Sequence, residues 1–425
     1  MLQLIIGHVT TNSVKIWVRG KPVATAAVVE LQDNDTPVFH QQAQLVADDY
    51  NTATVVAEGL RDNLRYDCIV HFDDGTVVRG LCKTLPVQAD SFNFLLASCH
   101  LCFGTERSSP EFGRINWVAG QEQSRFMIGC GDQIYIDTIF PGLGVKSRDD
   151  YRQRYEQTWA SPEVAQVFGT LPQYMIVDDH EIYNNFVNAN LNSRQQELLD
   201  WAVSSYRIFQ HAHNPDTESV FYYNFSCCHA DFFVMDLRTE RTATQMISDT
   251  QFGKLLDWLN TRAVGRIKFI ISSVPLFTQV GKVWEKDKWS EERYISQRNQ
   301  LIELLMQSDH KRVIILSGDI HLASHAEISY EQAGQSFSIH ELISSPIKQT
   351  QLPLLSSHPS PVIDINGTSV AYALSRHMGG PVVEGESHVP LVNNFMSISV
   401  SENAVHYKVY AANSEELLFE DDIFF

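Results

Sequence analysis

The stretch MIVDDHEIYNN, residues 175–185, joins a short apolar run to three acids, a histidine and two asparagines. A loop rich in turn-forming residues, or a helix start capped by an aspartate, could account for it alone. The choice between these interpretations and a functional site depends on how the other apolar runs of the chain end.

Four further apolar runs end in chemically useful side chains. They are FNFLLASCH (92–100), RFMIGCGDQIYID (125–137), DFFVMDLRTER (231–241) and RVIILSGDIH (312–321). In open α/β sheets, ligands bind outside the carboxyl ends of the strands. A single Gly-Asp after a strand usually marks a turn. Because five apolar runs of this chain end in such side chains, the sequence predicts that these side chains share one site.

The side chains at these endings are carboxylates, imidazoles, amides, a phenol and a thiol. Oxygen donors suit Ca²⁺, Mg²⁺, Mn²⁺ or Fe³⁺, whereas a pure zinc site would favour histidine and cysteine. An aspartate between two ions can bridge them, and paired metals about 3.5–4 Å apart stabilise displacement at phosphorus. Nearby arginines could clamp phosphate oxygens.

The pattern of apolar and polar residues changes near residue 88. Residues 1–88 contain short β-like runs and a hairpin around Asp-Asp-Gly, and Tyr66 stands where β-sandwiches often carry a corner tyrosine. We therefore predict an immunoglobulin- or fibronectin-like β-sandwich over 1–88. Residues 89–425 alternate apolar runs with helical patterns, which predicts an α/β domain. Helices are expected over 149–172, broken at Pro162, and over 193–212, 248–260 and 290–308.

Composition limits the partners. The 425 residues carry a net charge of −19, which argues against docking on nucleic acid. No window is apolar enough to span a membrane, and the N-terminal residues do not resemble a signal peptide. We expect a cytoplasmic protein, or alternatively a periplasmic or secreted one after leader removal. The adjacent Cys227 and Cys228 are interpreted as buried, small apolar residues.

Six motifs in order resemble the PhoD-type alkaline phosphatases and phosphodiesterases, a branch of the calcineurin-like metallophosphoesterases. They are Ser98-Cys99, GDQIY (131–135), DDHEIYNN (178–185), MDLRTER (235–241), WSEER (289–293) and LSGDIH (316–321). The resemblance implies a four-layer α/β/β/α sandwich after the N-terminal β-domain. Val177 stands where the family often has tryptophan, and residues 374–390 are expected to form a loop or lid.

The resemblance also implies a metal centre with one Fe³⁺ and Ca²⁺ ions; a Zn²⁺ or Mn²⁺ pair is the alternative. The iron would be bound by the Cys99 thiolate and the Tyr135 phenolate, and Asp132 would bridge the ions. The implied ligands are Cys99, Asp132, Tyr135, Asp179 or its neighbour Asp178, Asn185 or Asn184, Asp319 and His321.

Three more residues receive roles from the resemblance. His180 would assist the leaving group, or else only orient a ligand. Arg238 and Arg241 would bind phosphate, or else pair with Asp236 or Glu240.

The expected function is hydrolysis of small phosphate monoesters or diesters by metal-bound hydroxide. The alternatives are a dinuclear Zn²⁺ or Mn²⁺ enzyme with a specialised diester substrate, and a non-catalytic binding protein.

Overall fold

The computed structural model describes residues 3–102, 108–137, 145–217, 219–280, 287–349 and 392–425, with the backbone of short strands between 359 and 378. The expected loop or lid over 374–390 lies largely outside the described residues. Among the described helices, none is long and apolar enough to cross a membrane.

Two antiparallel sheets, ordered β1-β2-β5 and β4-β3-β6-β7, form the N-terminal β-sandwich. Tyr66 on β6 accepts a hydrogen bond from the Arg61 backbone N–H at 2.8 Å, so it ties the strand to the preceding turn. The strands are β1 (Leu4–Val9), β2 (Ser13–Arg19), β3 (Ala26–Asp33), β4 (Thr36–Gln44), β5 (Thr52–Glu58), β6 (Arg65–Phe72) and β7 (Val77–Lys83).

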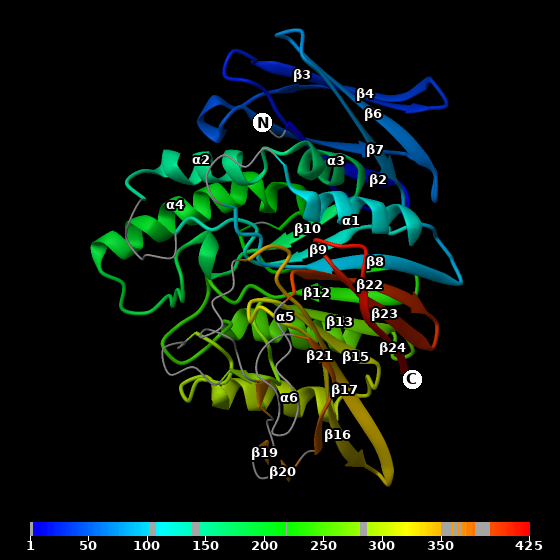
Figure 1. The fold of residues 1–425 in the computed structure, drawn as a ribbon, viewed down its shortest axis with the longest axis vertical. Coiled ribbons are helices and arrows are strands. Elements are labelled where there is room, and N and C mark those ends of the chain that lie inside the picture. The colour runs from blue at the N-terminus through cyan, green and yellow to red at the C-terminus, as the bar shows by residue number, and fades with distance from the viewer. Residues whose placement is uncertain are drawn as a thin grey trace.

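Two mixed sheets lie face to face below the sandwich (Figure 1). The first has the order β10-β9-β8-β22-β23-β24 and the second β11-β12-β13-β15-β17-β16-β21. The strands of the first sheet are β8 (Ser91–Ala97), β9 (Met127–Cys130), β10 (Gln173–Ile176), β22 (Asn394–Ser401), β23 (Ala404–Ala411) and β24 (Leu417–Phe424). The strands of the second sheet are β11 (Tyr223–Cys227), β12 (Ala230–Val234), β13 (Ile267–Ser272), β15 (Val313–Ser317), β16 (Ala323–Gln332), β17 (Gln335–Ser344) and β21 (Ala371–Met378).

Helices cover the outer face of each sheet, which confirms the four-layer α/β/β/α arrangement. α1–α4 lie between the β-sandwich and the first sheet, and α5 and α6 cover the second (Figure 1). Their bounds are α1 (Pro110–Gln121), α2 (Arg148–Thr158), α3 (Pro162–Thr170), α4 (Ser193–Phe209), α5 (Asp249–Thr261) and α6 (Ile295–Gln307).

Helix ends follow the local chemistry of the sequence. Pro162 starts α3, behind the Ser161 side chain that accepts a hydrogen bond from Val164 N–H, so the predicted break is confirmed. The Ser248 side chain caps α5 in the same way. The predicted start of α6 at residue 290 is wrong by five residues, because residues 290–294 form a turn and a bend before the helix begins at Ile295.

Aromatic side chains fill the space between the two large sheets. The ring of Phe94 on β8 lies edge-on to Phe269 on β13 and to Phe232 on β12, with centroids 5.3 and 5.4 Å apart. Phe126 adds a third such contact to Phe232 at 5.5 Å. These rings fix the spacing of the sheets, and thereby the distance between the strand ends that carry the site.

The β-sandwich packs tightly on the helical layer. Trp17 on β2 donates its indole N–H to the Ile208 carbonyl of α4 at 2.9 Å. A Cβ added to Gly80 on β7 would collide with the backbone carbonyl oxygen of Gly169 on α3, so only glycine fits there. Buried residues from both regions form one continuous core. The predicted domain boundary at residue 88 stays a prediction.

Candidate metal centre

The predicted ligands lie in the loops that follow parallel strands, and five of them have left-handed backbone conformations. Cys99, Asp132, Asn185, Asp319 and His321 have φ values of 60°, 55°, 57°, 66° and 55°. Such values are uncommon for residues other than glycine, and they cluster at functional positions that the surrounding fold enforces. The sharp turns direct side chains from separate strands to one edge of the sheets.

Two glycines make the close approach of these turns possible. Gly131, before Asp132, has φ +90°, and a Cβ there would lie 2.5 Å from the Asp178 Cβ. A Cβ on Gly318, before Asp319, would lie 2.8 Å from the Cys130 carbonyl oxygen. The glycines of the two Gly-Asp motifs are therefore required by neighbouring backbone and side chains.

Glu181 joins two of the turns. Its carboxylate accepts hydrogen bonds from three backbone N–H groups, those of Asp132 at 3.1 Å, Gln133 at 2.6 Å and Asp178 at 2.8 Å. Sequence reasoning assigned Glu181 no role, although it stands inside the DDHEIYNN motif. Its three bonds hold the ends of β9 and β10 in one register.

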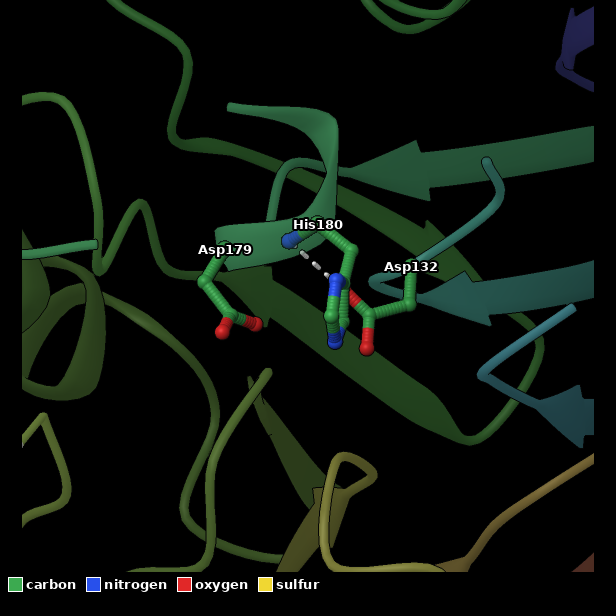
Figure 2. Close-up of side chains that lie close together, drawn as sticks. All are labelled: Asp132, Asp179 and His180. Atoms are coloured by element: carbon green, nitrogen blue, oxygen red, sulfur yellow. Dashed lines mark hydrogen bonds between the residues drawn. The ribbon is translucent and has the colours of Figure 1, made fainter. Parts of the chain in front are cut away.

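Four carboxylates converge at this edge. One oxygen from each of Asp132, Asp178, Asp179 and Asp319 lies within 4.8 Å of the others, and Asp132, Asp179 and His180 form a second group of this kind. Figure 2 shows the latter three side chains, with the His180 backbone N–H donating to Asp132 Oδ1 at 3.2 Å. We call these four aspartates the carboxylate cluster.

The predicted iron ligands surround Asp132. Its Oδ2 atom lies 3.4 Å from Cys99 Sγ and 3.3 Å from the Tyr135 hydroxyl. The same hydroxyl lies 3.4 Å from His321 Nε2. The structure thus brings together four of the predicted ligands, which come from three different strand ends.

The two asparagines lie beside the cluster. The Asn185 backbone N–H donates to Asp179 Oδ2, and that of Asn184 donates to Asp137 Oδ2 at 2.6 Å. Their side chains as metal ligands stay predictions.

Burial makes this concentration of acids costly without cations. It raises the pKa of Asp132 well above its usual value, and it raises that of Asp319 to about 7. It also raises the pKa values of Cys99 and Tyr135, and the neighbouring acids add to the shift. Asp178 Oδ2 is buried and makes no hydrogen bond within the described part of the chain. Buried anionic oxygens of this kind fit bound metal ions.

The carboxylates around His180 favour its protonated form. Its Nδ1 atom lies 2.7 Å from Asp137 Oδ1, and its ring packs on Tyr135 with centroids 3.9 Å apart. Burial by itself would lower its pKa, but Asp137, Asp179 and Asp132 together raise it well above the usual value. Nδ1 is committed to Asp137, so Nε2 is the ring nitrogen that could donate a proton.

Arg238 and Arg241 are buried and bonded to protein atoms. Arg238 pairs with Asp178 and, through Nη1, with Asp287 Oδ2 at 2.8 Å. Arg241 donates to the carbonyl oxygens of Leu237 at 2.7 Å and Asp287 at 2.8 Å. The ion-pair partners of Arg238 are thus different from those considered in the sequence analysis. Phosphate binding by either arginine stays a prediction.

Sequence reasoning missed one cation beside the cluster. Lys288 Nζ lies 2.7 Å from Asp319 Oδ1 and 3.1 Å from Asp287 Oδ2. Asp287 and Lys288 directly precede the WSEER motif. Nothing in the local sequence indicates that Lys288 reaches Asp319, which follows a strand 31 residues further along the chain.

The comparisons with known proteins agree with this geometry. A family model described as PhoD-like phosphatase matches residues 94–359, more than half of the chain. A solved structure of PhoD is similar with a TM-score of 0.74 and 15% identity, over 99% of this chain and 88% of that one. Purple acid phosphatase PPD1 from yellow lupin (Lupinus luteus) seeds gives 0.64 and 10%, over 99% and 74%. Among curated proteins, no sequence matches.

Proposed function

The chain belongs to the PhoD-like phosphatase family, and on that premise we propose that it hydrolyses small phosphate esters with bound metal ions. The observation that supports this most directly is the convergence of four buried aspartate oxygens within 4.8 Å of one another. Carboxylates this close and this buried need compensating cations, and Arg238 and Lys288 supply two positive charges for the four aspartates.

We propose that Cys99, Tyr135 and His321 hold a ferric ion with Asp132, and that the other three cluster aspartates and Asn185 hold calcium. Phenolate and carboxylate oxygens suit Fe³⁺, and carboxylate and amide oxygens suit Ca²⁺. When bound, the ions would supply charge neutralisation and Lewis-acid activation of water. A pair of Zn²⁺ or Mn²⁺ ions is the alternative content.

Side chains of the protein itself would donate the proton to the leaving group and position the carboxylates of the cluster. His180 holds a proton on Nε2, because Asp137 accepts from Nδ1 and stabilises the cation. It would pass this proton to the leaving oxygen as the ester bond breaks. Arg238 forms ion pairs with Asp178 and Asp179 and thereby positions both carboxylates. Its Nη2 atom lies 3.5 Å from Asp179 Oδ1. Direct phosphate binding by Arg238 and Arg241 stays a prediction.

The test is a substrate panel run with elemental analysis on one preparation. Nitrophenyl monoesters and diesters would be offered with Ca²⁺, Fe³⁺, Mn²⁺ or Zn²⁺ added in turn. Turnover with iron and calcium bound, and a visible absorption band lost in Cys99→Ala or Tyr135→Phe, would support the proposed centre. Stoichiometric zinc or manganese would select the alternative content. Failure to cleave any ester under all conditions would overturn the proposed function.

A further inference from the structure

A pair of neighbouring cysteines forms an unusual turn away from the carboxylate cluster. Cys227 is the last residue of β11 and pairs with Ala230 of β12, so Cys228 and His229 are the two central residues of a hairpin. Cys228 has φ +45°. The first central position of such hairpins favours glycine when φ is positive. A strained residue other than glycine there calls for a functional explanation.

The two thiols differ in their surroundings. Cys227 is 2% exposed and belongs to the main core, as expected from the sequence. Cys228 differs from that expectation, because it is only partly buried. It lines a cleft of about 600 Å³ together with residues 87–90, His229 and Arg266. One thiol is therefore open to small molecules, and the other lies directly behind it.

The thiols are already in contact. Their Sγ atoms lie 3.9 Å apart, and Cys228 Sγ lies 3.8 Å from the Pro86 carbonyl oxygen. The contact with Cys227 lowers the pKa of Cys228; burial opposes this shift, and Arg125 and Arg266 add smaller lowering effects. The pKa of Cys227 is raised by the same contact and by burial. A thiol with a lowered pKa beside cationic groups is the reactive kind.

We propose that Cys228 and Cys227 form a hydroperoxide-reactive site that closes to a vicinal disulfide. The Cys228 thiolate attacks one peroxide oxygen, the O–O bond breaks and hydroxide leaves, which gives a sulfenic acid. The Cys227 sulfur then attacks Cys228, the S–O bond breaks, and hydroxide leaves with the Cys227 proton as water. Overall, two thiols and one hydrogen peroxide give one disulfide and two waters.

Peptide mass spectrometry of the native, metal-loaded protein tests this site independently of phosphoesterase activity. Hydrogen peroxide should remove the mass of two hydrogens from the peptide containing residues 227–228, and dithiothreitol should restore it. In Cys227→Ser, Cys228 should instead take up dimedone, a reagent for sulfenic acids. In Cys228→Ser, Cys227 should stay unmodified.

Two internal controls keep the result decisive. Cys68 and Cys82 are buried in the β-sandwich and should remain unmodified in the same samples. If either variant unfolds, as judged by circular dichroism, the wild-type peptide alone decides. Oxidation of Cys228 no faster than that of Cys68, or oxidation without the disulfide in the wild type, would overturn the proposal.

Discussion

His180 Nδ1 and Asp137 Oδ1 lie 2.7 Å apart, beside the carboxylate cluster. Asp137 Oδ2 also accepts a hydrogen bond from the Asn184 backbone N–H at 2.6 Å. The Asp137 carboxylate is therefore held by two residues of the DDHEIYNN segment, His180 and Asn184. This pair sets which ring nitrogen of His180 carries an available proton.

The first prediction concerns this pair. Asp137→Asn removes one of the three carboxylate charges that raise the pKa of His180, together with the acceptor of its Nδ1 proton, so proton donation to the leaving oxygen should weaken. We expect kcat/KM to fall by about 100-fold for an alkyl phosphate ester, the lower range for general-acid catalysis. A nitrophenyl ester, whose leaving group needs no proton, should lose much less. Equal losses on both substrates would show that Asp137 only supports the structure.

The second prediction concerns metal and charge. Asp132→Asn removes one buried negative charge, so in chelator the variant should melt above the wild type, by roughly 2–4 °C. With metal present the order should reverse, because the cations would lose one carboxylate ligand and bind at least about tenfold more weakly. Differential scanning calorimetry in both conditions measures this crossover. Asp67→Asn, an exposed site on β6, is the matched control and should melt like the wild type in both.

The third prediction separates backbone strain from steric fit. Gly131 and Gly75 have similar φ values of +90° and +83°, but a Cβ would clash with Asp178 only at Gly131. Gly75→Ala should therefore cost about 1–2 kcal/mol of unfolding free energy from its backbone alone. Gly131→Ala should cost about 1–3 kcal/mol more, because the added carbon displaces the side chain of Asp178. Urea unfolding of both variants checks the difference, and equal costs would contradict the close approach.

The fourth prediction is a dependence of stability on pH. His325 Nε2 and His340 Nδ1 lie 3.0 Å apart between the sheets, and burial lowers their pKa values to about 4 and about 3. Unfolded histidines titrate near 6.5, so between these values the unfolded chain binds more protons. The stability present above pH 6.5 should therefore be lost as the pH falls toward 4.

His340→Gln isolates this effect. Between pH 7.5 and 5.5 the wild type should lose roughly 1 kcal/mol for each such histidine, and the variant should lose correspondingly less. Urea unfolding at fixed metal concentration measures both slopes. Identical slopes would show that the pair does not titrate on unfolding.

The sequence by itself determined where the site residues stand along the chain. Short apolar runs, Gly-Asp turns and helix caps are local patterns, so Asp132 and Asp319 could be assigned to strand ends from their neighbours alone. The four-layer arrangement followed from the family resemblance of the motifs between Ser98 and His321. The helix break at Pro162 needed only the fixed φ of proline.

Only the tertiary structure decided which of these side chains meet. The bonds of Lys288 to Asp319 and of Arg238 to Asp178 and Asp287 join residues 31 to 60 positions apart. No local pattern encodes such contacts, because they depend on how the two sheets pack around Phe94 and its neighbours. Packing also left Cys228 beside an open cleft while it buried Cys227, although the two residues are adjacent and chemically identical.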